Sequence, residues 1–456
     1  MNLYNTLTKK IEPIKQTNES LDIFVCGPTV YDFSHIGHAK TYIQFDALIR
    51  TLRFFAYDVN YLQNITDIDD KIIARSKEQK KPWQDISREF EKAYLDDMKL
   101  LGNTSVDTYA RATDHMEDII SQVQRLLKKN HAYVIDGDGI YFEISTFAEY
   151  GKLSGRTDIQ QHDAESRIDQ SDKKRGWNDF CLWKFSKADE PTWDAPFGAG
   201  RPGWHIEDTA ITEHYLGPQY DLHGGAVDLI FPHHEAEITQ MEAASGKKPF
   251  VKHWAHTGFL MIDSEKMSKS LGNFYTIRDV LAKGYGADVL RLFMLQTHYR
   301  SEINFTFDQL DATQNRLNRW LSTLDLLWQP RDSDTPTFDI QSIQDDIQNS
   351  LREDFNTPKA IAHFEKLIKH IDANGITSDS HEDTVEVVHT ITATLGINLD
   401  TTDISNEAKK LLNKRQKARN NKDFALADTI REQLASTFQI AVNDSSDRQT
   451  WHRIHS

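Results

Sequence analysis

The first third of the chain alternates short apolar runs with longer amphipathic stretches. Residues 21–26 (LDIFVC) are mostly apolar and are followed by Gly27 and Pro28, a pattern typical of a buried strand that ends at a turn. Apolar positions at helical spacing then run from about residue 37 to 52, and a second strand-like segment lies near 59–63. Strand, helix and strand in this order predict a parallel α/β layer.

The middle of the chain has a different pattern. Residues 132–144 (AYVIDGDGIYFEI) contain two strand-like runs around a glycine-containing turn, which predicts a hairpin. The polar, poorly periodic stretch 155–176 that follows predicts a mobile loop. Strand and helix patterns return with 220–225 (YDLHGG) and with a predicted helix from about residue 232 to 245. We therefore expect residues 115–200 to be an insertion within an α/β domain.

The last third of the chain reads as helical, with apolar residues at helical spacing in 304–328 and a small C-terminal unit that begins near Ser405. The chain carries a net charge of −16, which by itself argues against nucleic-acid binding. However, residues 409–422 (KKLLNKRQKARNNK) form a basic patch, which fits either a nucleic-acid-binding surface or a solvated helix face. Composition does not decide between the two.

Size and composition indicate a soluble, multidomain protein. The 456 residues are too many for one core, and 39% hydrophobic with 27% charged residues is typical of globular proteins. No apolar run approaches the ~18 residues of a membrane span, and the N-terminal segment lacks the apolar stretch of a secretory signal. The two cysteines, Cys26 and Cys181, rule out a disulfide framework and fit a reducing compartment. We predict a cytoplasmic location.

Two histidines flank an Ile-Gly step in residues 34–39 (SHIGHA), at the start of the first predicted helix. A helix N-terminus presents unpaired N–H groups and the positive end of the helix dipole, and both attract phosphate. Gly37 would let ATP approach the backbone closely, while His35 and His38 can donate hydrogen bonds to its phosphates. The alternative is that the two histidines only cap the helix.

Residues 266–270 (KMSKS) combine two lysines with small hydroxyl side chains and predict a flexible basic loop. Lys266 and Lys269 could neutralise the charge that develops on a leaving pyrophosphate, with Lys269 also contacting ATP. The alternative is an ordinary surface loop. The two motifs in this order, with α/β patterning between them, resemble the class I aminoacyl-tRNA synthetases, whose nucleotide site is a Rossmann-type sheet.

Further segments resemble the cysteinyl-tRNA synthetases in particular, and together they extend over essentially the whole chain. They are FVCGPTVYDFSHIGHAKTY, NITDIDDKI, GWNDFCLWK, GAGRPGWHIE, DLHGGAVDLIFPHHEAE, KMSKSLGNF, DFNTPKA and ARNNKDFALADTIR. The resemblance implies that L-cysteine is activated to cysteinyl-adenylate with Mg-ATP as substrate and is then transferred to tRNA(Cys).

The same resemblance implies an α/β fold, a Rossmann-type parallel sheet with an inserted connective domain, followed by an α-helical bundle and a small anticodon-binding unit. The expected limits are 1–114 and 201–258 for the two halves of the Rossmann catalytic domain, 115–200 for the inserted connective domain, 259–304 for the KMSKS and stem-contact region, 305–400 for the helical bundle and 401–456 for the anticodon-binding unit.

The resemblance also implies one zinc ion that recognises the substrate thiol. A thiolate is a soft zinc ligand and an alcohol is not, so a metal separates cysteine from serine better than an apolar pocket does. The family pattern has a cysteine where this chain has Asp208, so either the carboxylate replaces the thiolate or the site is degraded. Carried over by position, the ligands are Cys26, Asp208, His233 and Glu237, and further candidates nearby are His205, Glu207, His223 and His234.

The remaining site residues are carried over in the same way. Gly27, Thr66 and Trp204 resemble residues around the bound cysteine, with plain packing as the alternative for Trp204. Gly225 and Asp228 stand where class I enzymes hold the ribose and adenine of ATP. Cys181 is expected to be a buried core residue.

Two other functions stay open. A related cysteine ligase of mycothiol synthesis shares both motifs and the zinc, but it does not need the anticodon-reading module that the C-terminal segments resemble. A catalytically silent tRNA-binding paralogue is suggested by Asp208, although the intact HIGH and KMSKS motifs favour an active enzyme. We expect the protein to act as a monomer.

Overall fold

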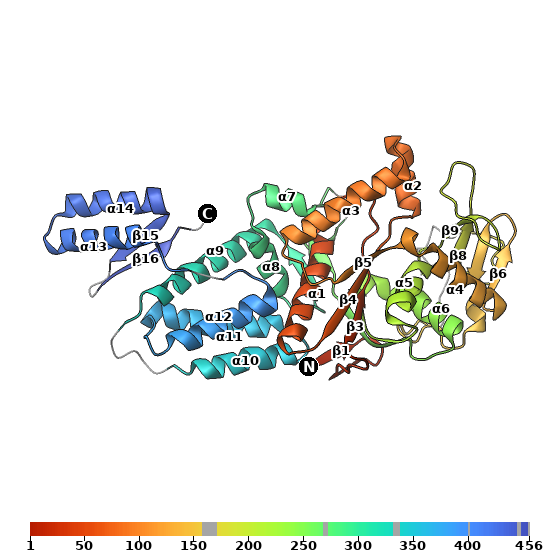
Figure 1. Ribbon diagram of the computed structural model, residues 1–456, viewed down its shortest axis with the longest axis horizontal. Coiled ribbons are helices and arrows are strands. Elements are labelled where there is room, and N and C mark those ends of the chain that lie inside the picture. The colour runs from red at the N-terminus through yellow and green to blue at the C-terminus, as the bar shows by residue number, and fades with distance from the viewer. Residues whose placement is uncertain (157–170, 268–271, 332–337, 400–401, 445–447, 455–456) are drawn as a thin grey trace. The chain divides into compact units, whose positions relative to one another are not determined.

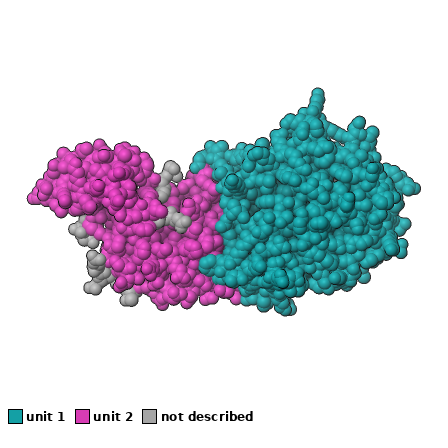
Figure 2. All heavy atoms as spheres, in the orientation of Figure 1, with its two compact units in different colours: residues 1–284, 299–304 teal, residues 285–298, 305–456 magenta. Residues whose placement is uncertain are grey.

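The computed structural model describes residues 1–156, 171–267, 272–331, 338–399, 402–444 and 448–454. The chain forms two compact units (Figures 1 and 2). The first consists of residues 1–284 and 299–304, and the second of residues 285–298 and 305–456. Most of the predicted loop at 155–176 and the motif residue Lys269 lie outside the described residues.

A five-stranded parallel sheet with the order β11-β10-β3-β4-β5 lies at the centre of the first unit, as the sequence pattern predicts (Figure 1). The chain passes from β3 to β4 and β5 on one side, and only much later adds β10 and β11 on the other. The winding direction therefore reverses between β3 and β10, and ligands bind at the carboxyl ends of the strands at such a reversal. The strands are β3 (Leu21–Val25), β4 (Val59–Ile65), β5 (Thr108–Arg111), β10 (Tyr220–Ala226) and β11 (Val251–Thr257).

Helices pack closely against this sheet. Helix α1 (Ile36–Phe54) approaches β10 so closely that a Cβ atom at Gly224 would lie 2.4 Å from the Phe45 ring. Helices α5 (Ile206–Leu216) and α6 (Glu235–Ser245) share one hydrophobic cluster with the sheet, in which Ile211 and Met241 pack with Phe24. The other helices of this unit are α2 (Asp70–Gln79), α3 (Trp83–Leu100), α4 (Met116–Lys128) and α7 (Ile277–Ala282).

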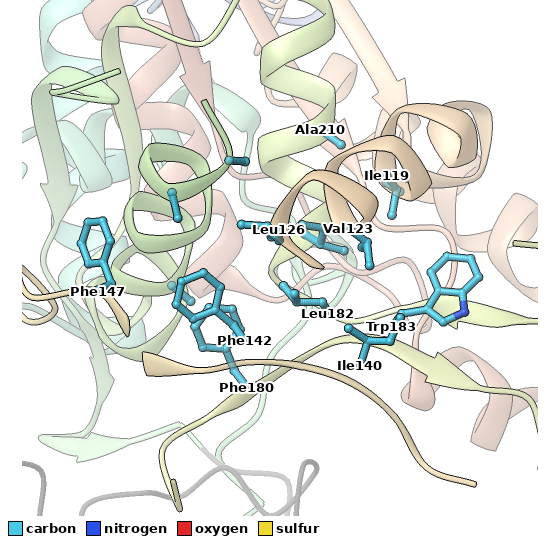
Figure 3. Packing of buried hydrophobic residues seen from close by; sticks show 14 of the residues in the cluster. Ile119, Val123, Leu126, Ile140, Phe142, Phe147, Phe180, Leu182, Trp183 and Ala210 are labelled. Atoms are coloured by element: carbon cyan, nitrogen blue, oxygen red, sulfur yellow. The ribbon is translucent and has the colours of Figure 1, made fainter. Parts of the chain in front are cut away.

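The inserted segment forms a four-stranded antiparallel sheet, β6-β7-β8-β9, packed against α4. Strands β6 (Ala132–Ile135) and β7 (Gly139–Phe142) form the predicted hairpin, followed by β8 (Phe180–Phe185) and β9 (Gly200–Pro202). Figure 3 shows Val123 and Leu126 of α4 pointing toward Phe142 and Leu182 of the sheet. This cluster continues into α5 through Ala210 and into α6 through Ala243, so the insertion also packs against those two helices.

Two smaller sheets complete the first unit. Strands β1 (Asn2–Asn5) and β2 (Lys10–Pro13) pair antiparallel, and a three-stranded sheet has the order β13-β12-β14. Its strands are β12 (Leu260–Ile262), β13 (Glu265–Lys266) and β14 (Ile303–Phe305). The hairpin β12–β13 therefore leads directly into the KMSKS motif.

The second unit is mainly helical, as predicted. Its C-terminal part packs two helices against the antiparallel hairpin β15–β16 around a small core that includes Leu412, Leu434 and Trp451. None of the helices in the described part of the chain combines the length and apolarity needed to cross a bilayer. Elements of this unit are α8 (Ala287–Leu295), α9 (Phe307–Leu324), α10 (Ile340–Arg352), α11 (Thr357–Asn374), α12 (His381–Leu395), α13 (Asn406–Asn420), α14 (Phe424–Phe438), β15 (Ile440–Asp444) and β16 (Gln449–Arg453).

Candidate active site

A buried cluster of sulfur, nitrogen and oxygen atoms lies where the winding of the sheet reverses. The backbone N–H of Cys26, directly after β3, donates to the carbonyl of Gly224 in β10 at 3.0 Å. The Cys26 Sγ lies 3.5 Å from Asp208 Oδ2 and 3.9 Å from Glu237 Oε1. His233 Nε2 lies 2.9 Å from Asp208 Oδ2 and 2.8 Å from Glu237 Oε1. The structure thus brings the four predicted metal ligands together, all of them buried.

Local structure explains how distant segments supply these four side chains. Asp208 stands in the first turn of α5, and Glu237 in the first turn of α6. His233 belongs to the wide helical turn Ile230–His234 that leads into α6, so it is placed one turn before Glu237. Asp208 is held by Asn64 of β4, whose Nδ2 donates to Asp208 Oδ1 at 2.6 Å.

The charges in this cluster favour a bound cation. Burial raises the pKa of the Cys26 thiol well above its usual value, and the carboxylates of Glu237 and Asp208 raise it further. Burial likewise raises the pKa of Glu237 to about 8. Burial opposes a charge on His233, but Glu237 and Asp208 outweigh it and raise the pKa of His233 to about 10. A divalent cation would stabilise the deprotonated thiol and carboxylates that burial here disfavours.

The donor atoms fit zinc. One thiolate, one imidazole and two carboxylates are all accepted zinc ligands, and the carboxylate of Asp208 keeps the charge that a thiolate would bring. In addition, Glu237 Oε2 accepts no hydrogen bond from any described residue although Glu237 is fully buried. Such an atom is costly to bury unless something else binds it.

The three predicted cysteine-binding residues surround this cluster. The Gly27 N–H donates to Asn64 Oδ1 at 2.5 Å, and a Cβ atom at Gly27 would lie 1.7 Å from the Asn64 backbone oxygen, so only glycine fits. The buried hydroxyl of Thr66 donates to Glu207. The indole of Trp204 lies over His233, with ring centroids 4.3 Å apart, and stays 42% exposed. Trp204 is therefore not a plain core residue.

The two histidines of the HIGH motif do cap helix α1. The His38 N–H donates to His35 Nδ1 at 3.3 Å, the His35 N–H donates to His38 Nδ1 at 3.4 Å, and the rings stack 3.7 Å apart. Burial lowers the pKa of His38 well below its usual value, and the neighbouring His35 lowers it further. A neutral His38 can still donate one hydrogen bond. A Cβ atom at Gly37 would lie 2.9 Å from the His35 ring, so a larger residue would displace that ring.

The segment after KMSKS is joined to the HIGH motif by backbone hydrogen bonds. The Ile36 N–H donates to the Tyr275 carbonyl and the Ile277 N–H donates to the Ser34 carbonyl, both at 3.0 Å. Residues 275–277 and the HIGH motif are thus neighbours in space although they are far apart in the sequence. Lys266 ends the hairpin β12–β13 and is exposed.

The two residues predicted to hold the nucleoside lie at the end of β10. Gly225 leaves no room for a side chain, because a Cβ atom there would lie 2.8 Å from the His234 ring. Asp228 is exposed in the short turn Val227–Leu229. Both positions fit a nucleotide at the carboxyl end of the sheet.

Asn64 and Lys40, which the sequence analysis did not single out, also lie at the site, together with Glu207, one of the nearby candidates. Asn64 links Gly27 to Asp208 and is buried. The sequence does contain one hint of this role, because Asn64 is an amide residue at the end of a strand-like segment. Glu207 is buried beside Asp208, and its pKa is raised well above its usual value by burial and by Asp208. Lys40 is buried two residues after His38, where a helical pattern alone gives no hint of its role.

Comparison with known proteins identifies the family. Residues 11–315 match the tRNA synthetases class I (C) catalytic domain, 346–400 the DALR domain and 401–451 the cysteinyl-tRNA ligase anticodon binding domain. The chain is 41% identical over 455 residues to the cysteine–tRNA ligase of Thermoplasma acidophilum, covering 99% of this chain and 100% of the relative. It is 40% identical over 471 residues to that of Halorhodospira halophila, covering 99% of each. This chain belongs to the cysteine–tRNA ligase family.

The fold agrees with this assignment. The structure of Mycobacterium tuberculosis methionyl-tRNA synthetase in complex with methionyl-adenylate superposes with a TM-score of 0.60 at 18% identity, covering 83% of this chain and 92% of that one. At this identity the likeness concerns the fold alone, and it confirms the class I α/β architecture. As a member of its family the chain is an aminoacyl-tRNA ligase, and the six domain limits predicted from the sequence stay predictions.

Proposed function

We propose that this enzyme joins L-cysteine to tRNA(Cys) and that a zinc ion held by Cys26, Asp208, His233 and Glu237 selects the cysteine. The observation that carries the metal part is the buried set of four ligand atoms at the reversal point of the sheet. When bound, zinc would offer the substrate thiolate a soft ligand site that a serine hydroxyl cannot use. Trp204 lies over His233 and is exposed, which makes it the candidate wall on the side where cysteine enters.

The first chemical step requires no acid or base in this proposal. The cysteine carboxylate attacks the α-phosphorus of ATP, and pyrophosphate leaves with the Mg²⁺ that ATP carries. His35 and His38 at the start of α1 would position the phosphates, and Lys266 and Lys269 would neutralise the developing charge on the leaving group. The hydrogen bonds that hold residues 275–277 against the HIGH motif support this division of work, because they bring the segment that follows KMSKS to the start of α1.

The C-terminal unit would bind the tRNA anticodon. Exposed lysines 410, 414 and 417 follow one another at helical spacing on α13, whereas Arg415 is buried and paired with Asp444. The basic patch is thus partly structural and partly available to phosphates. Lysines that contact phosphate give affinity with strong salt dependence, while specificity comes from contacts with the bases.

Cysteine-dependent exchange of pyrophosphate into ATP tests the proposal. The full-length protein should support exchange with cysteine and at least 100-fold less with serine. Removal of zinc by a chelator should abolish exchange, and added zinc should restore it. Exchange that survives with no metal in the protein would refute the metal part, while tRNA binding without any exchange would favour the silent paralogue.

A further inference from the structure

A group of two histidines and one aspartate lies at the surface of the first unit, outside the candidate active site. It consists of His115, Asp118 and His214, whose ligand atoms all lie within 4.8 Å of one another. His115 Nδ1 and His214 Nδ1 each lie 3.1 Å from the same oxygen, Asp118 Oδ2. Three side chains that can bind a metal ion therefore converge on one position, and the proposed function uses none of them.

The fold brings these three side chains together from different elements. His115 ends the short helical turn Ala112–His115, and Asp118 follows in the first turn of α4. His214 stands in the last turn of α5. Helices α4 and α5 share the hydrophobic cluster of the insertion, so the core that packs these helices also keeps the three side chains close to one another.

The geometry of the group fits a tetrahedral cation such as zinc. Zinc bonds of about 2.0–2.2 Å place two ligand atoms about 3.3 Å apart, close to the 3.1 Å that separates each histidine nitrogen from Asp118 Oδ2. The rings of His115 and His214 lie with their centroids 4.9 Å apart and cross at 67°, so both nitrogens can point to one position. Two imidazoles favour zinc, cobalt, nickel or copper over magnesium and calcium, which prefer oxygen ligands.

The surroundings of the group give an ion access from solvent. His115 is buried, whereas the side chains of Asp118 and His214 are 40% and 49% exposed. Asp118 and His214 also border an open cavity of about 350 Å³, which leaves room for a water molecule as a fourth ligand. Arg125 borders the same cavity, but Glu213 accepts from it at 2.8 Å and compensates its charge.

Hydrogen bonds alone are the alternative explanation of these contacts. A neutral imidazole carries one hydrogen, and if both rings carry it at Nδ1, each donates to Asp118 Oδ2. Such a hydrogen-bonded group would hold α4 and α5 together without binding anything. The two explanations differ in one measurable property, which is the affinity of the group for a divalent metal ion.

We propose that His115, Asp118 and His214 bind zinc or a similar divalent transition-metal ion, which joins the start of α4 to the end of α5. Helix α5 carries Asp208 in its first turn, so the ion would also steady the helix that supplies this side chain to the candidate active site. The two metal sites share no residue. This inference therefore stands independently of the metal part of the proposed function.

Zinc binding to the full-length protein, first freed of metal with a chelator, tests the proposal. In equilibrium dialysis the wild type should bind one more zinc ion per chain than His214→Gln. His214 is exposed, so this variant should fold and keep the pyrophosphate exchange activity of the wild type. Asp118→Asn should lose the same ion. Cobalt(II) identifies which ion is lost, because a cobalt–thiolate bond gives a strong near-ultraviolet band and these three ligands do not.

The matched control is His131→Gln, which removes a partly exposed histidine of the same unit that lies outside the group. It should bind as much zinc as the wild type. Equal zinc binding by the wild type and His214→Gln would overturn the proposal in favour of hydrogen bonds alone, and an equal loss in His131→Gln would show unspecific binding to surface histidines. A wild type that binds this ion but shows no cobalt–thiolate band would support the proposal and refute the metal part of the proposed function.

Amide hydrogen exchange tests whether the ion joins the two helices. Added zinc should slow exchange in the last turn of α5 in the wild type but not in His214→Gln. Equal exchange in both proteins, with and without zinc, would refute a role of the ion in holding α5.

Discussion

Lys40 offers a quantitative test of how the HIGH helix is anchored. Its side chain is 1% exposed and donates to the carbonyls of Gly258 at 2.6 Å and Tyr299 at 3.3 Å, and to Gln44 Oε1 at 3.2 Å. The acceptors that the described residues offer it are thus uncharged. This amine therefore ties α1 to the segment that enters β12, and we propose to replace it with the apolar side chain of similar length in Lys40→Met.

The expected effect depends on pH with a definite sign. Burial lowers the pKa of Lys40 from 10.5 to about 7. Between these values the folded protein holds Lys40 neutral while the unfolded chain holds it protonated, so the unfolded chain binds the extra proton and the free energy of unfolding rises with pH. Each pH unit in this window raises the free energy of unfolding by about 1.4 kcal/mol. From pH 6 to pH 9 the wild type should gain about 3 kcal/mol relative to Lys40→Met, which lacks this titration.

Thiol labelling reports on the unit that contains Lys40, because both cysteines of the chain, Cys26 and Cys181, are buried there. Urea midpoints from pulsed labelling at pH 6 and pH 9 give the difference in free energy of unfolding between the wild type and Lys40→Met at each pH. The exposed Lys128→Met on α4 is the control, and its difference from the wild type should not change. An unchanged difference for Lys40→Met across this range would refute the reasoning, since it would mean that Lys40 stays charged.

Three further predictions concern the substrate pocket, the motif loop and the C-terminal unit. Trp204→Ala should raise the KM for cysteine about 10-fold with kcat nearly unchanged, and a loss confined to kcat in pyrophosphate exchange would contradict a binding role. Lys269→Ala should slow adenylate formation, measured by stopped-flow kinetics, far more than it weakens cysteine binding, measured by calorimetry. Equal losses of rate and affinity would count against a transition-state role. Asp444→Asn should destabilise the C-terminal unit by about 1 kcal/mol, because Arg415 loses the charge of its bidentate partner, while Asp444 is exposed and Gln449 still accepts from Arg415. Faster amide hydrogen exchange in β15 would measure this loss, and unchanged exchange would show that the pair is dispensable.

The spacing of apolar residues was enough to predict the strands that are buried along their whole length or form a hairpin. The apolar run at 21–26 is β3, and the hairpin within 132–144 is β6–β7, because each has the alternation or continuity that a sheet imposes. The helix predicted from about residue 232 begins as α6 only at Glu235. Pro232 cannot donate an N–H and disfavours a helical conformation at Phe231, which indeed has φ −138° and ψ 129°, so a wide turn precedes the regular helix.

Asp208 shows where sequence reasoning had to stop. An aspartate in place of the family's cysteine fits either a replaced metal ligand or a lost metal site. The two cases differ in the distances between the ligand atoms, which residue spacing in the sequence does not give. In the structure Asp208 is 2% exposed, one of its oxygens is held by Asn64, and the other faces Cys26 and His233. A merely polar residue at the start of a helix would point to solvent. Burying a carboxylate beside a thiol and a second carboxylate is costly unless positive charge compensates, and either a protonated His233 or a bound metal ion can supply that charge, so the burial of Asp208 fits a retained metal site.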